Sequence, residues 1–124
     1  MFNFNFLLSS IILLCLDFLY LYFMKNYFNK QVKVIQNSPL KVNLLGMILS
    51  YLFILIGLNY FIIIPNKSIS DAFLLGLVIY GVFDTTNYAL FKSWSIITLV
   101  IDTLWGASLF AITTFLVKKI SLHK

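Results

Sequence analysis

Four long apolar segments, separated by shorter polar ones, account for most of the chain. They cover approximately residues 4–24, 44–64, 72–91 and 96–117. Each has about the 20 residues that an α-helix needs to cross roughly 30 Å of hydrocarbon. None of them alternates polar and apolar positions, as the strands of a membrane β-barrel do. The pattern predicts an all-α membrane protein, a four-transmembrane-helix bundle formed by a single transmembrane domain over residues 1–124.

Prolines and small polar residues mark the ends of these segments. Pro65 follows the second segment, where a proline cannot continue the helix. Ser70 or Asp71 is expected to cap the third helix, and Ser93 or Ser95 the fourth. The second and third connections are short, so consecutive helices are expected to be antiparallel, with both chain ends on one face of the membrane.

The first connection, residues 25–43, is the longest and contains four lysines. Two interpretations of it are open. Its lysines and aromatic residues suit a short helix that lies on the lipid headgroups, with Val32 and Ile35 turned toward lipid. Alternatively, the first helix continues past residue 24 into water.

Composition supports a membrane location and argues against other classes of protein. Of the 124 residues, 61% are apolar and only 10% are charged, whereas about 25% of the residues of soluble proteins are charged. The protein is therefore expected to be integral to a membrane, with the lipid bilayer as its partner. The net charge of +5 comes from lysines scattered over the loops, which suits anionic headgroups and does not predict nucleic-acid binding.

The chain has one cysteine, Cys15, and one histidine, His123. A structural or catalytic zinc site needs three or four such ligands, so neither a metal nor another cofactor is expected. Cys15 lies in an apolar segment, and we interpret it as a buried, inert thiol.

Three of the four acidic residues, Asp17, Asp84 and Asp102, lie inside the predicted spans. An ionised aspartate at the centre of a membrane helix costs about 2.5–3.5 kcal/mol. Because consecutive helices alternate in direction, the three positions fall at a similar depth, on the side of the long connection. Carboxylates crowded in a medium of low dielectric constant cannot all ionise, so at least two are expected to share a proton or a cation. These three residues form the candidate proton- or cation-binding site.

Each of these aspartates is followed three positions later by a residue that can donate a hydrogen bond to a carboxylate. Residues three apart share one helix face, so each helix is expected to turn a polar stripe into the bundle. The supporting polar shell is expected to comprise Tyr20, Tyr80, Thr86, Asn87 and Trp105. In the alternative interpretation, the aspartates are neutral or hydrogen-bonded contacts that only fix the register of the helices.

Two short motifs carry a family resemblance. Residues 80–94 read YGVFDTTNYALFKSW, and residues 101–106 read IDTLWG. They contain the patterns Tyr-Gly-x-x-Asp-x-Thr-Asn and Asp-x-x-Trp-Gly, with Asp84 in the first and Asp102 in the second. Over almost its whole length the chain resembles an uncharacterised family of small four-helix predicted membrane proteins. The resemblance implies four helices and the importance of the same acids, and it implies no activity.

The sequence leaves three functions open. The leading hypothesis is a small proton- or cation-coupled transporter or conductance pathway, because intramembrane acids are typical of proton relays. Four short helices enclose little volume, so this function would need a homo-oligomer or another membrane protein. The first alternative is a non-catalytic membrane scaffold or assembly protein.

The second alternative is an intramembrane lipid hydrolase. Two neighbouring carboxyl groups can divide the roles of acid and base when their environments differ. Asp84 and Asp102 would be that pair, and Asn87 would donate a hydrogen bond to the oxyanion. The sequence contains no pattern typical of a serine or metal hydrolase, so a function other than catalysis is favoured.

Overall fold

The structure, a computed structural model, describes residues 1–122, and His123 lies outside the described part. Its four long helices are α1 (Phe4–Gln36), α2 (Leu44–Leu58), α3 (Ile69–Leu90) and α4 (Ile96–Leu122). A short π-helix, η1 (Asn59–Ile63), extends α2. α1, α2 with η1, α3 and α4 are each long and apolar enough to cross a membrane. The predicted all-α, four-transmembrane-helix bundle is therefore confirmed.

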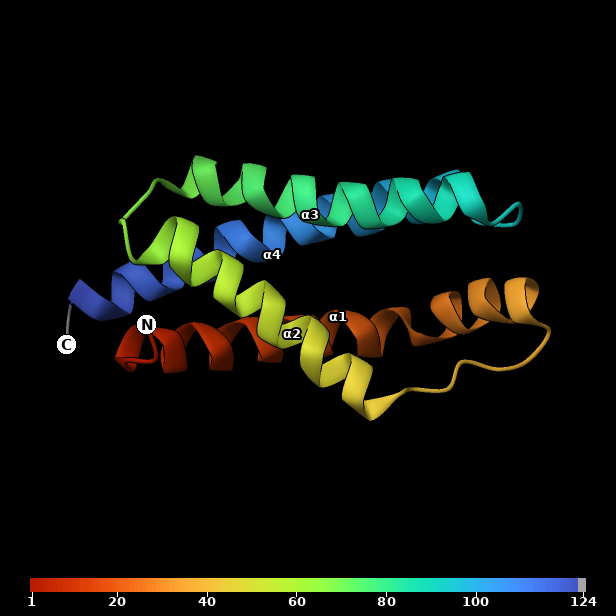
Figure 1. Cartoon of the computed structure of the whole chain (residues 1–124), viewed down its shortest axis with the longest axis horizontal. Coiled ribbons are helices and arrows are strands. Elements are labelled where there is room, and N and C mark those ends of the chain that lie inside the picture. Colours follow the sequence, from red (N-terminus) through yellow and green to blue (C-terminus); the bar gives the residue numbers. More distant parts are fainter. Residues whose placement is uncertain (123–124) are drawn as a thin grey trace.

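The four helices do not pack equally closely. α3 and α4 run in opposite directions, side by side along most of their length (Figure 1). α1 packs against α4, and α2 crosses α1 at an angle, so that the N-terminal half of α2 lies away from α3 (Figure 1). The start of α1 and the end of α4 meet at one end of the bundle, where Ser121 Oγ donates a hydrogen bond of 2.7 Å to Asn5 Oδ1.

Serine side chains cap the N-termini of α3 and α4, where backbone N–H groups have no partner within the helix. Ser68 Oγ accepts a hydrogen bond of 3.0 Å from the backbone N–H of Asp71. The sequence pattern favours Ser70 or Asp71 as this cap, but both lie inside the first turn because α3 begins directly after Ser68. At α4, Ser95 Oγ accepts a hydrogen bond of 3.1 Å from the N–H of Ile97, and Ser95 is one of the two expected caps.

α1 continues well beyond the expected span of residues 4–24. Its 33 residues correspond to about 50 Å at 1.5 Å per residue, which exceeds the roughly 30 Å thickness of the hydrocarbon. Its last turns lie against the connection between α3 and α4: Gln31 Nε2 donates to the backbone oxygen of Ser93 at 2.8 Å, and Gln31 Oε1 accepts from Thr98 Oγ1 at 2.8 Å. Residues 25–36 of the long connection thus continue the first helix and dock on the bundle, and they do not form a separate helix lying on the headgroups.

Two glycines allow α3 and α4 to approach closely. A Cβ atom built on Gly76 would lie 3.0 Å from Ala107 Cα, and one built on Gly106 would lie 2.6 Å from Tyr80 Cβ and overlap the Tyr80 ring. Small residues permit such approach between membrane helices, where van der Waals packing drives association. Tyr80 is thereby fixed against the backbone of α4.

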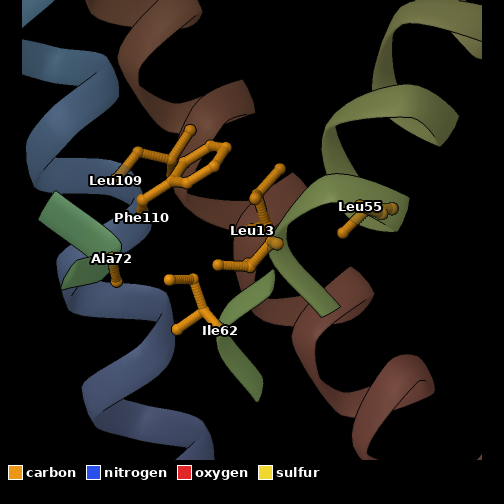
Figure 2. Packing of buried hydrophobic residues seen from close by; sticks show 7 residues of the cluster. Leu13, Leu55, Ile62, Ala72, Leu109 and Phe110 are labelled. Atoms are coloured by element: carbon orange, nitrogen blue, oxygen red, sulfur yellow. The ribbon is translucent and has the colours of Figure 1, made fainter. Parts of the chain in front are cut away.

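The buried apolar core lies in the half of the bundle nearer the chain ends. It joins all four long helices and η1 (Figure 2). Its residues are Leu13, Leu55, Leu58, Ile62, Ala72, Leu109 and Phe110. Cys15 is exposed on the outer face of α1, so the expectation that its thiol is buried is wrong. Asp17 follows this core by one helical turn on α1, and Asp102 precedes it by about two turns on α4. The acidic residues therefore lie in the other half of the bundle, where α2 diverges from α3.

Candidate functional site

Asp17 is a buried carboxylate whose two oxygens are both hydrogen-bonded. Its side chain is 7% exposed. Oδ1 accepts a hydrogen bond of 2.8 Å from Trp105 Nε1 of α4, and Oδ2 accepts one from the hydroxyl of Tyr51 of α2. Asp17 therefore connects α1 with α2 and α4, because donors from two other helices satisfy its two carboxyl oxygens.

Asp102 is half-buried and receives its donor from α1. Tyr20 Oη donates a hydrogen bond of 3.3 Å to Asp102 Oδ1. The rings of Tyr20 and Trp105 stack with their centroids 4.6 Å apart and an interplanar angle of 5°. The donors are thus exchanged between the two helices: Tyr20 of α1 serves Asp102, and Trp105 of α4 serves Asp17.

This exchange differs from the expected polar stripes. Residues three apart share a helix face, but a side chain on that face also reaches the facing helix when two helices pack closely. At the contact of α1 and α4 the interhelical partners are the ones that form hydrogen bonds. The spacing of three positions therefore identifies Tyr20 and Trp105 as donors, but it pairs each of them with the aspartate of its own helix instead of the aspartate of the facing helix.

Asp84 has a different environment from the other two acids. Its side chain is fully buried, and neither carboxyl oxygen has a hydrogen-bond partner within residues 1–122. The polar groups that interact with it are the carboxyl of Asp102 and the hydroxyl of Thr103, which is itself buried without a partner. Asp84 and Asp102 thus form a close pair of carboxyl groups at the contact of α3 and α4.

A cleft of about 530 Å³ lies beside this pair, between α2 and α3. Asp17 and Asp102 contribute to its wall. Tyr20, Tyr51 and Tyr80 also line it. Its apolar rim includes Phe53 of α2 and Phe83 of α3, which are 69% and 56% exposed on the surface that faces lipid.

The structure brings together most of the expected site residues and leaves two outside. Tyr20, Tyr80 and Trp105 surround the acids, and Tyr80 interacts electrostatically with both Asp17 and Asp102. Thr86 is exposed and Asn87 is half-buried, and neither lines the cleft among its described residues. Thr86 and Asn87 lie nearer the C-terminal end of α3, beyond the level of Asp84.

Two residues of the site are not indicated by the sequence patterns. Tyr51 is one of the few residues with a polar group in the second apolar segment, and that isolation is the signal that could have identified it. Thr103 directly follows Asp102 in the sequence, and this position does not indicate that its hydroxyl faces Asp84 of another helix. Both contacts depend on how the helices cross, which periodicity within one helix does not specify.

Comparison with known proteins gives a family. A family model described as a predicted membrane protein (DUF2177) matches residues 2–118. Searches of curated proteins and of solved structures found no match. The matched range includes α1, α2 and α3, most of α4, and every residue of the acidic site. The chain therefore belongs to this family of predicted membrane proteins, DUF2177.

Proposed function

We propose that this protein is a small proton- or cation-coupled transporter or conductance pathway, in which Asp84 and Asp102 bind and release the ion. The observation that carries the proposal is the fully buried Asp84 carboxyl, which has no hydrogen bond among residues 1–122. An aspartate that only held helices together would have its oxygens satisfied, as those of Asp17 are. An unsatisfied buried carboxylate is costly, so a bound proton or cation is the simplest compensation.

The pairing of Asp84 with Asp102 supports exchange of that ion. Two facing carboxyl groups in a low-dielectric medium do not both carry a charge without a proton or a cation between them. Asp102 also lines the cleft, whereas Asp84 is sealed from the surroundings. In the proposed function an ion enters through the cleft, reaches Asp102, and is shared with Asp84.

Asp17 has a positioning role in this proposal. Its hydrogen bonds with Trp105 and Tyr51 hold the helices that form the cleft wall. The stacked pair of Trp105 and Tyr20 then directs the Tyr20 hydroxyl to Asp102. We also propose that a complete path across the membrane requires several copies of the chain, because a cleft on one side of a four-helix bundle does not form a pore.

The test is ion flux into liposomes that contain the purified protein. We expect a pH-dependent flux that Asp84→Asn or Asp102→Asn reduces to the level of empty liposomes. Asp71→Asn is the matched control, since Asp71 is exposed at the start of α3 and should leave the flux unchanged. Absence of flux in the unmodified protein across protons, Na⁺ and K⁺ would contradict the proposal.

The scaffold function is the second candidate, and the hydrogen-bonded Asp17 favours it. If the acids only hold the bundle together, the Asp84→Asn protein should keep its biological function and form the same complexes. The lipid-hydrolase alternative has less support. Asn87, the expected donor to the oxyanion, does not line the cleft that contains Asp102.

A further inference from the structure

A second pocket, of about 330 Å³, lies at the end of the bundle where the chain ends meet. It is formed by the first turn of α1, the turn after η1, and the last turns of α4. Its lining combines polar and apolar side chains. The polar residues are Asn5, Asn66, Thr114, Lys118 and Ser121, and the apolar ones are Ile63 and Val117.

Hydrogen-bond donors are left available in this pocket. Lys118 Nζ donates to Asn66 Oδ1 at 3.1 Å, and Ser121 Oγ donates to Asn5 Oδ1 at 2.7 Å. The Asn66 and Asn5 side chains thus use their oxygens in contacts within the protein. Among residues 1–122 their NH₂ groups have no hydrogen bond to a side chain or backbone, so they can donate to a ligand. The Lys118 ammonium has further N–H groups for the same purpose.

Thr114 is the clearest sign that the pocket takes a ligand. Its side chain is fully buried, lines the pocket, and has a hydroxyl without a hydrogen-bond partner within residues 1–122. Buried hydroxyls are normally paired, so a ligand oxygen would supply the missing partner. Among the described residues, the lining contains the Lys118 cation and neutral donors but no acidic residue. The positive charge of Lys118 therefore favours an anionic ligand.

We propose that this pocket binds the phosphate group of an anionic phospholipid. The pocket lies at the ends of the membrane-spanning helices, the depth at which lipid phosphates are found. The Lys118 ammonium and the neighbouring donors would hold the phosphate oxygens, while Ile63 and Val117 would contact the glycerol and the first part of the acyl chains. The site is separate from the acidic pair and does not depend on ion coupling.

The chain offers two matched pairs of variants for the test. Lys118 lines the pocket, whereas Lys119 is exposed on the same helix, with its ammonium over the Phe115 ring. Thr113 and Thr114 are both fully buried with unpaired hydroxyls, but only Thr114 lines the pocket. In each pair, the same substitution is made once at a residue that lines the pocket and once at a neighbouring residue that does not.

The measurement is binding of phosphatidylglycerol to the purified protein in detergent micelles, by native mass spectrometry. We expect Lys118→Gln to weaken binding by about fivefold or more, and Lys119→Gln to change it little. Thr114→Val should also weaken binding, and Thr113→Val should not. Helical content and melting temperature of each variant, measured beside the unmodified protein, show that the fold is kept.

Several outcomes would overturn the proposal. Equal loss of binding in Lys118→Gln and Lys119→Gln would mean that only general attraction between lysines and anionic lipid is measured. Equal binding of phosphatidylglycerol by Thr113→Val and Thr114→Val would mean that the pocket is not the binding site. Displacement of the lipid by millimolar inorganic phosphate would assign the site to free phosphate and would contradict the phospholipid assignment.

Discussion

At the scale of single residues, the surroundings of each aspartate determine what it can do. Asp17 receives hydrogen bonds from Trp105 and from Tyr51, so both of its carboxyl oxygens are satisfied within the protein. Asp84 is equally removed from lipid but has no such donors among the described residues. This difference is the basis for proposing a structural role for Asp17 on α1 and ion binding at Asp84 on α3.

This difference predicts opposite effects of one substitution on stability. Asp17→Leu leaves two donors without an acceptor and should lower the free energy of unfolding by about 1–3 kcal/mol for each donor. Asp84→Leu removes a carboxyl that has no hydrogen bond, and should leave stability unchanged or raise it. Unfolding of the purified protein in mixed micelles by increasing SDS measures both. Equal losses in the two variants would show that Asp84 is also a stabilising contact.

A second prediction at this scale concerns the glycines. Gly106→Ala places a methyl group into the Tyr80 ring, so it should separate α3 from α4 and cost about 1–3 kcal/mol or more. Gly57→Ala is the control, because a Cβ there meets nothing within 4 Å. That control should be neutral or stabilise α2 by up to about 1 kcal/mol through helix propensity. The same SDS titration reports both values.

At the scale of elements, the apolar segments predict the number and order of the helices, because length and hydropathy alone decide whether a segment can cross lipid. They do not predict where α1 ends. Lysines within residues 25–36 suggest a connection, yet no residue there breaks a helix. α1 ends only at Asn37, which adopts a left-handed conformation with φ of 59°, two residues before Pro39.

The docked end of α1 can be tested separately from the bundle. Gln31→Ala removes the hydrogen bonds with Ser93, Ser95 and Thr98. Amide hydrogen exchange over residues 29–36 should become about tenfold faster or more, since each lost bond contributes on the order of 1 kcal/mol. Lys30→Ala, at an exposed position, should have no such effect. Unchanged exchange in Gln31→Ala would mean that the end of α1 is not held by these contacts.

The acidic site is only partly predictable at this scale. Helix direction and position place the three aspartates in one half of the bundle, and the i, i+3 pattern identifies Tyr20 and Trp105 as donors. The exchange of these donors between α1 and α4 is not predictable from one sequence, because it depends on the angle and register at which the two helices pack. The same reason explains why Tyr51 and Thr103 have no clear signal and why Thr86 and Asn87 lie outside the cleft.

At the scale of the whole molecule, the bundle has a closed half and an open half. The core around Leu13, Leu58 and Phe110 joins all the helices near the chain ends. In the other half α2 diverges from α3, and the cleft beside Asp102 results. Of the acidic pair, Asp102 therefore lines the accessible cleft and Asp84 is fully buried, while the core and the Asp17 contacts keep the geometry of the pair. The central claim of our account is that Asp84 and Asp102 hold one exchangeable proton or cation.

Infrared spectroscopy of the purified protein in lipid tests this claim most directly. The C=O stretching band of a protonated carboxylic acid should be present at neutral pH without added salt. It should disappear in both Asp84→Asn and Asp102→Asn, remain in Asp71→Asn, and weaken when a competing cation binds or when the pH is raised. A spectrum without this band in the unmodified protein, or a band that neither Asp84→Asn nor Asp102→Asn removes, would contradict the shared proton and would favour a purely structural role for the acids.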